Sequence, residues 1–240
     1  MVITGAAGLI GSALVDSFLA AGATVHALDC NDTGPEGRGA GHTGTPAAER
    51  LHLHPIDVAD PDAIASFARG LERLDILVSS VGGNDDRRGV ELLDSHSWRS
   101  ALEVNLVGPA LLAGALTPQL RASDAAAVVF VTSVNGVAPS PWLHYGAAKA
   151  GLAKFTVDLA HDLALDGVRV NAVAPGRVVE TGQPADRRAD TPYGLGGGAS
   201  PIEAIVHAVQ FLADAEMSPM TTGQQLLVTG APERGGLLGR

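Results

Sequence analysis

The chain has 240 residues, of which 46% are hydrophobic and 18% are charged. This length allows one or two domains, and a mean hydropathy of +0.19 excludes a chain that is disordered throughout. A formal charge of −10 and a pI near 5.1 argue against a nucleic-acid or anionic-membrane surface, because an acidic protein repels both. The one cysteine, Cys30, excludes an internal disulfide and a thiolate metal cluster, and it favours a reducing, cytoplasmic setting.

Short apolar runs alternate with segments of helix length, a pattern typical of βαβ units around a parallel sheet. The runs expected as strands are 2–4, 24–28, 51–56, 75–79, 127–132, 168–173 and 225–228. The segments expected as helices are 9–21, 61–71, 98–120, 145–165 and 202–213. No repeat or linker divides this pattern. We therefore expect one α/β domain over residues 1–240, a Rossmann-type doubly wound parallel sheet with helices on both faces.

Two segments interrupt the alternation. Residues 31–46 contain five Gly and two Pro, which cannot hold a stable helix, so a mobile loop is expected there. Residues 177–200 contain two Pro and a run of three Gly, and a loop of this length predicts a substrate lid. The uncharged stretch 104–120 is shorter than the usual span of about 20 residues and is expected as a buried helix, so no membrane or targeting segment is predicted.

A glycine-rich turn, Thr-Gly-Ala-Ala-Gly-Leu-Ile-Gly at 4–11, joins the first strand to the first helix. Glycines at Gly5, Gly8 and Gly11 let the chain turn tightly and let backbone N–H groups approach a pyrophosphate, which the helix dipole also favours. The same turn without a ligand would have the same sequence. The motif by itself is therefore a weak indication of a dinucleotide site.

Asp29 ends the second expected strand, 18 positions after Gly11. A carboxylate at this place accepts hydrogen bonds from the adenosine ribose hydroxyls and repels a 2′-phosphate. The first Arg or Lys of the chain is Arg38, so no cation precedes it to attract that phosphate. The sequence favours NAD over NADP, against the alternative that Asp29 is a solvated turn residue.

Tyr145 and Lys149 lie four residues apart in an expected helix, so their side chains share one face about 6 Å apart. A phenol has a pKa of about 10, and burial would raise it further. Use of Tyr145 as a base near neutral pH therefore requires positive charge, which Lys149 and an oxidised nicotinamide ring can supply. The alternative is a surface pair with no catalytic role.

Taken together, these motifs resemble the short-chain dehydrogenases/reductases, in their compact branch, over almost the whole chain. The resemblance rests on Tyr-Gly-Ala-Ala-Lys at 145–149, Val-Thr-Ser-Val-Asn-Gly at 131–136, Glu-Val-Asn-Leu at 103–106 and Val-Arg-Val-Asn-Ala-Val-Ala-Pro-Gly at 168–176. Weaker matches are Asp-Val at 57–58, Leu-Val-Ser-Ser-Val-Gly at 77–82, Phe-Leu-Ala at 211–213 and Thr-Gly-Gln at 222–224.

The resemblance implies a role for four side chains. Tyr145 would move the proton of an alcohol or carbonyl, Ser133 would hold the substrate oxygen, and Lys149 would lower the phenol pKa and bind the nicotinamide ribose. Asn105 would fix a water in the proton relay. Ser133 stands one residue closer to Tyr145 than is usual, which makes Thr132 the alternative; a simple strand end and a buried structural amide are the alternatives for Ser133 and Asn105. Cofactor contacts are expected at Gly5, Gly8, Leu9, Ile10, Gly11, Asp29, Asp57, Val58, Gly82, Tyr145, Lys149, Pro175 and Gly176.

The sequence departs from the compact pattern at two places. The middle glycine usually stands where this chain has Leu9, whereas Gly8 gives the spacing of the extended, epimerase-like branch. Ser79 and Ser80 replace two asparagines, which predicts weaker hydrogen bonds between the central strands. The first strand is also short, since only three residues precede Thr4.

The function expected is an NAD(H)-dependent oxidoreductase that interconverts a small secondary alcohol and a ketone, as a homo-oligomer (tetramer or dimer) packed through helices 98–120 and 145–165. One alternative is a catalytically silent NAD-binding regulator, which would not need Ser133, Tyr145 and Lys149. Another is a nucleotide-sugar epimerase or dehydratase, suggested by the glycine spacing and opposed by the length. The residues expected around a partly apolar pocket are Trp142, Leu143, Val81, Tyr193 and Leu195, with Arg187 and Arg188 of the lid expected in solvent.

Three of the eight histidines stand at suggestive places. His52 and His54 share one face of an expected strand, but no third ligand has partner spacing, so no metal is predicted. His144 directly precedes Tyr145 and is a candidate for the pocket wall.

Overall fold

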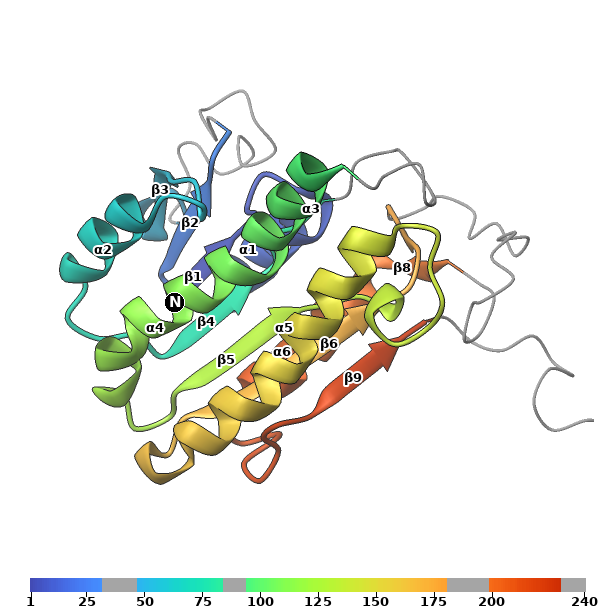
Figure 1. The fold of residues 1–240 in the computed structure, drawn as a ribbon. Coiled ribbons are helices and arrows are strands. Elements are labelled where there is room, and N and C mark those ends of the chain that lie inside the picture. Colours follow the sequence, from blue (N-terminus) through green and yellow to red (C-terminus); the bar gives the residue numbers. More distant parts are fainter. Residues whose placement is uncertain (32–46, 84–93, 181–198, 230–240) are drawn as a thin grey trace, which may run out of the picture.

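The computed structural model describes residues 1–31, 47–83, 94–180 and 199–229. Seven parallel strands form one twisted sheet (Figure 1). In sheet order they are β3 (Leu51–Pro55), β2 (Val25–Asp29), β1 (Val2–Thr4), β4 (Ile76–Ser79), β5 (Ala127–Val131), β6 (Arg169–Pro175) and β9 (Gln225–Val228). The strand order reverses direction between β1 and β4, which confirms the Rossmann-type fold.

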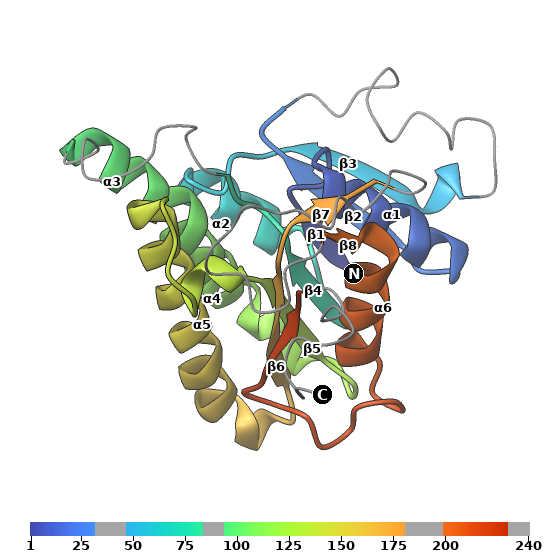
Figure 2. The same ribbon diagram turned by 90° about the vertical axis from the view of Figure 1, so that its right-hand side faces the viewer.

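Helices cover both faces of this sheet (Figure 2). Their bounds are α1 (Leu9–Ala20), α2 (Pro61–Arg69), α3 (Ser95–Leu102), α4 (Gly108–Arg121), α5 (Leu143–Asp162) and α6 (Ile202–Ala213). One core lies between the sheet and α2, α4 and α5, and a second lies between the sheet and α1 and α6. The doubly wound arrangement therefore buries both faces of the strands.

The short first strand is fully buried at the centre of the sheet. Val2 packs into the core of α2, α4 and α5, and Ile3 packs into the core of α1 and α6. All three residues of β1 pair in register with β2 on one side and with β4 on the other. Three residues are thus enough to place the glycine-rich turn at the middle of the carboxyl edge.

The helix expected at 98–120 begins earlier, because the Asp94 side chain caps it by accepting from the backbone N–H groups of His96 and Ser97. The helix runs from α3 through a π-helical turn, Glu103–Val107, into α4. Among the described residues, one helical stretch, Ser95–Arg121, is long and apolar enough to cross a membrane. Its apolar side is occupied by the core: Leu112, Leu116 and Leu120 are fully buried.

Other boundaries shift for local reasons. The helix expected at 145–165 gives way after Asp162 to a 3₁₀ turn, Ala164–Asp166, and Gly167 at φ +72° ends it. Most of the loop predicted at 31–46 and of the lid predicted at 177–200 lies outside the described residues. The two flanks of the predicted lid pair with each other as β7 (Val178–Val179) and β8 (Ser200–Pro201).

Three histidines lie together on the β2–β3 edge. His26 Nδ1 is 3.1 Å from His54 Nε2, and the ring of His52 stacks on His26 with centroids 4.8 Å apart. Phe67 of α2 meets the rings of His26 and His54 edge-on. A hydrogen bond between two imidazoles requires one unprotonated nitrogen, so the contact cannot persist when both rings are cationic. Burial, with help from the neighbouring histidines, lowers the pKa of His26 to about 4 and also lowers that of His54.

The lowered pKa values predict a loss of stability in acid. Below pH 6.5, the His26 side chain is protonated in the unfolded chain but stays neutral in the folded chain. The free energy of unfolding therefore falls as the pH drops from 6.5 toward 4. His26→Gln should keep a polar side chain without titration. Between neutral pH and about pH 5, its melting temperature should therefore fall less than that of the wild type. His161→Gln, at an exposed helical site, is the control. If the melting temperatures of the wild type, His26→Gln and His161→Gln fall equally between neutral pH and about pH 5, the prediction is contradicted.

Candidate active site

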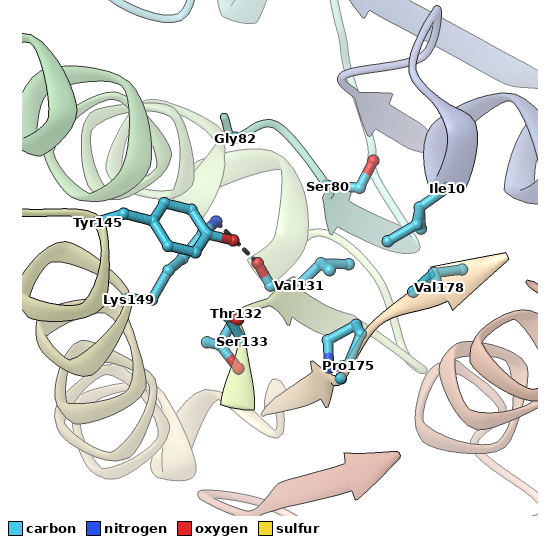
Figure 3. A pocket seen from close by; sticks show the side chains of 11 residues that line it. Ile10, Ser80, Gly82, Val131, Thr132, Ser133, Tyr145, Lys149, Pro175 and Val178 are labelled. Carbon is cyan, nitrogen blue, oxygen red and sulfur yellow. Dashed lines mark hydrogen bonds between the residues drawn. The ribbon is translucent and has the colours of Figure 1, made fainter. Parts of the chain in front are cut away.

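The carboxyl ends of the parallel strands meet at one edge of the sheet, where a cavity of about 140 Å³ opens. It lies between the ends of β4, β5 and β6, the start of α1 and one face of α5 (Figure 3). The cavity is lined by Ile10, Ser80, Gly82, Val131, Thr132, Ser133, Tyr145, Lys149, Pro175, Gly176 and Val178. The fold thus brings together residues expected at the site from five separate segments. Ser80 and Val178 line it too, although the sequence assigned neither a binding role.

Lys149 is the most buried ionisable group of this cavity, with 2% of its surface exposed. Its Nζ donates to the carbonyl of Val131 at 3.0 Å (Figure 3) and to that of Val81 at 3.3 Å. These carbonyls end β5 and follow β4, so the strand ends hold the ammonium group. Burial without a carboxylate partner among the described residues lowers the pKa of Lys149 to about 7.

Tyr145 lies one helical turn before Lys149 and presents its hydroxyl to the same cavity. The Lys149 Nζ is 5.8 Å from the centroid of the Tyr145 ring. Burial raises the pKa of the phenol, and the interaction with the Ser133 hydroxyl acts in the opposite direction. In the protein alone, therefore, the phenol is a proton donor at neutral pH, and additional positive charge is needed before it can act as a base.

The geometry favours Ser133 over Thr132 as the partner of Tyr145. Thr132 Oγ1 donates to the carbonyl of Val173 at 3.0 Å and accepts from the Gln225 side chain at 2.7 Å, so it is fixed within the sheet. Ser133 Oγ accepts from Asn135 N at 3.2 Å, and the Ser133 hydroxyl lowers the pKa of the Tyr145 phenol.

The loop between Ser133 and Tyr145 packs closely against α5. A β-carbon on Gly136 would lie 2.8 Å from Ala150 N, and one on Gly146 would lie 2.8 Å from Asn135 O. The two glycines therefore allow this close approach of the loop and the helix.

Asn105 is 1% exposed and stands in the π-helical turn. Its amide nitrogen donates to the carbonyls of Gly83 and Ala101, each at 3.0 Å, and its oxygen accepts from Gly83 N at 3.2 Å. The side chain therefore satisfies backbone groups beside the cavity, which was the alternative to a relay role. A β-carbon on Gly82 would lie 2.8 Å from both Asn105 Oδ1 and Lys149 Nζ. The absence of a side chain at Gly82 therefore leaves room for these two polar atoms.

The glycine-rich turn needs two of its three glycines for steric reasons. Gly5 has φ +65°, and a β-carbon there would lie 2.9 Å from Ser80 O; a β-carbon on Gly11 would lie 2.0 Å from Gly5 O. Gly8 precedes α1 in extended conformation, and a β-carbon there would lie 3.2 Å from Gly5 O, a less severe contact. The shifted middle glycine therefore leaves the tight turn intact.

The serines at the end of β4 form hydrogen bonds to β1. Ser80 Oγ donates to the carbonyl of Thr4 at 2.6 Å, and Thr4 Oγ1 donates to Ser79 Oγ at 3.3 Å. The short hydroxyls thus reach the neighbouring strand directly, and the expectation that they bind it more weakly than asparagines stays a prediction.

Asp29 is 7% exposed and is not a solvated turn residue. Its Oδ2 accepts from Ala7 N of the glycine-rich turn at 3.0 Å, and its Oδ1 accepts from the backbone N–H and the side-chain amide of Asn31. The carboxylate thus lies beside the turn that precedes α1, where a dinucleotide would have its pyrophosphate at the helix start and its ribose near Asp29. Asp57 is exposed and closes a turn with Ala59 N, next to the buried Val58.

Several residues expected at the pocket lie elsewhere. His144 is buried against Trp98 of α3, with ring centroids 6.3 Å apart, and does not line the cavity. As the residue next to Tyr145 on a helix, it points about 100° away from it. Trp142, Leu143 and Val81 are also absent from the lining. The remaining expected residues, Arg187, Arg188, Tyr193 and Leu195, lie outside the described residues.

Comparison with known proteins agrees with this geometry. A family model described as short chain dehydrogenase matches residues 1–191. Cis-4-hydroxycyclohexanecarboxylate dehydrogenase of Sinomonas cyclohexanicum is 34% identical, over 95% of this chain and 94% of the relative. The chain belongs to the short-chain dehydrogenase/reductase family. Members of this family are oxidoreductases that act on CH–OH groups with nicotinamide cofactors.

Solved structures of the same family have this fold. An oxidoreductase of Burkholderia thailandensis matches with a TM-score of 0.81 at 33% identity, over 98% of this chain and 92% of that one. A 3-oxoacyl-(acyl-carrier protein) reductase of Brucella melitensis with bound NAD matches with a TM-score of 0.81 at 28% identity, over 96% and 89%. These neighbours support the Rossmann-type fold of the chain.

The close approach at Gly82 can be tested by adding one methyl group. Gly82→Ala should lower the free energy of unfolding by about 1–3 kcal/mol, because the β-carbon would displace Lys149 Nζ and Asn105 Oδ1. Gly83→Ala is the matched control, since a β-carbon there would have no atom of the described residues within 4 Å. Urea unfolding of both variants measures the difference, and equal costs would show that the packing around Gly82 is loose.

Proposed function

We propose that this short-chain dehydrogenase interconverts a secondary alcohol and a ketone with NAD(H), and that Tyr145 is its general acid/base. The observation that carries the proposal is the meeting of Tyr145, Lys149 and Ser133 at one cavity, on the sheet edge that also holds Asp29. The likeness to a dehydrogenase of cis-4-hydroxycyclohexanecarboxylate, itself a secondary alcohol, supports the substrate class.

The choice of NAD rests on this chain's own residues, because structural neighbours carry either NAD or NADP. Asp29 offers a negative charge beside the glycine-rich turn, which suits ribose hydroxyls and disfavours a 2′-phosphate. When bound, the oxidised nicotinamide accepts the hydride that leaves the alcohol carbon. The pyrophosphate of the cofactor would be held by Gly5, Gly8, Leu9, Ile10 and Gly11. The contacts proposed for the nicotinamide end are Gly82, Pro175 and Gly176. The contacts proposed for the adenine are Asp57 and Val58.

Each polar side chain then has one task. The Ser133 hydroxyl donates to the substrate oxygen and holds it close to Tyr145. Tyr145, as phenolate, takes the alcohol proton as the hydride departs, and as phenol it returns a proton to the ketone in the reverse direction. Lys149 in its cationic form favours the phenolate and binds the nicotinamide ribose. Asn105 fixes the backbone at Gly83 and, as proposed from the family, a water of the proton relay.

Removal of the phenol hydroxyl tests the acid/base role. Tyr145→Phe should lower turnover of a secondary alcohol by about 10²–10⁴-fold, because the variant lacks the hydroxyl proposed to exchange the proton with the substrate oxygen. The NADH dissociation constant, measured by fluorescence titration, should stay within about twofold, since the ring remains in place. Unchanged turnover would remove Tyr145 from the mechanism.

The direction of the pH dependence follows from the raised pKa of the phenol. Alcohol oxidation needs the phenolate, so its rate should rise with pH, whereas ketone reduction needs the phenol and should slow as the pH rises. Lys149→Ala should slow alcohol oxidation mainly below about pH 7, where the Lys149 ammonium is charged and favours the phenolate. Initial rates across a pH series measure this, and a pH-independent rate in both directions would contradict it.

The competing functions predict other results. A silent regulator would bind NADH and turn over no alcohol or ketone, and a nucleotide-sugar epimerase would invert a substrate carbon with no net change in NADH.

Fluorescence titration with NADH and NADPH tests the cofactor choice; tighter binding of NADPH would contradict the role of Asp29. The single domain over residues 1–240, the homo-oligomer (tetramer or dimer) and the cytoplasmic location remain predictions.

A further inference from the structure

The carboxylate of Asp29 is almost fully engaged by the protein itself. Its Oδ1 accepts from Asn31 N at 2.9 Å and from Asn31 Nδ2 at 3.1 Å, and its Oδ2 accepts from Ala7 N at 3.0 Å. An ionised carboxyl group has about two favourable acceptor directions on each oxygen. Donors of the described residues therefore take three of the four directions, including both on Oδ1.

The occupied acceptor directions conflict with the proposed binding of both adenosine ribose hydroxyls by the Asp29 carboxylate. Two adjacent ribose hydroxyls that bind one carboxylate need an acceptor direction on each oxygen. Oδ2 can receive one hydroxyl beside Ala7 N, but a hydroxyl at Oδ1 meets a position that the Asn31 amide already fills. One donor must leave before both hydroxyls can bind.

The three donors differ in how easily they can leave. The N–H groups of Ala7 and Asn31 belong to the main chain, and Ala7 is part of the tight turn before α1. The Asn31 side chain is exposed and can turn into water, where its amide is solvated at little cost. The side-chain amide of Asn31 is thus the group that a ribose hydroxyl displaces.

We propose that Asn31 is a specificity-determining residue whose side-chain amide occupies an acceptor position on Asp29 and competes with the adenosine ribose of the cofactor. This inference rests on the proposed use of Asp29 in NAD binding. The competition weakens NADH binding relative to a chain without the amide. It does not help NADPH, because the 2′-phosphate is repelled by the Asp29 charge whether or not the amide is present.

Direct titration of the full chain with NADH and NADPH tests the competition without any substrate. Asn31→Ala removes the side-chain donor and keeps the backbone N–H, so NADH should bind about three- to tenfold more tightly, with NADPH affinity unchanged. Asn31→Leu, of similar size and without a donor, should behave in the same way. In an Asp29→Ala background, Asn31→Ala should have no effect on NADH affinity, because the amide acts only through the carboxylate.

The contrary outcomes separate this inference from the proposed function. Unchanged or weaker NADH binding by both Asn31 variants would overturn the competition and leave NAD use standing, since it would show that the amide orients Asp29 or is irrelevant to it. An equal gain in the Asp29→Ala background would overturn the route through the carboxylate. If the wild-type chain binds NADPH more tightly, or neither cofactor, the proposed use of Asp29 fails and the inference fails with it.

Discussion

The burial of one ammonium group organises the candidate site. Lys149 is nearly inaccessible, and the described residues offer it two main-chain carbonyls and no carboxylate. A cation in such surroundings loses much of its hydration, which is why its pKa falls to about 7. Its neighbours are arranged accordingly: Gly82 has no side chain where the ammonium lies, and the strand ends present their carbonyls to it.

This placement couples Lys149 to Tyr145 through electrostatics rather than through a direct bond. The ammonium nitrogen lies 5.8 Å from the ring centroid, one helical turn away. In the protein alone, burial outweighs the stabilisation of the phenolate, so the phenol is kept protonated. A cationic nicotinamide beside the ring would add the missing positive charge. The account therefore makes Tyr145 a base only when the oxidised cofactor is bound, which prevents proton abstraction in its absence.

Much of the architecture could be predicted from the sequence because it depends on local signals. Apolar runs placed every strand of the main sheet, and Tyr145, Lys149 and Ser133 met at one cavity as their spacing and family resemblance indicated. The errors arose where tertiary contacts decide. His144 was a candidate for the pocket wall, but it packs on Trp98, 46 residues earlier in the chain, and no sequence pattern encodes that contact. The engagement of Asp29 by Asn31 is equally invisible in the sequence, since it depends on side-chain geometry.

The most direct test of the central claim is a pH titration of tyrosinate absorbance with and without NAD⁺. The chain has only two tyrosines, Tyr145 and Tyr193, so the variant Tyr193→Phe reports on Tyr145 alone. We expect saturating NAD⁺ to lower the pKa of Tyr145 by at least about one unit, and we expect Lys149→Ala to raise this pKa both with and without NAD⁺ while leaving most of the NAD⁺-induced shift in place. A Tyr145 pKa that is the same with and without NAD⁺ would contradict it.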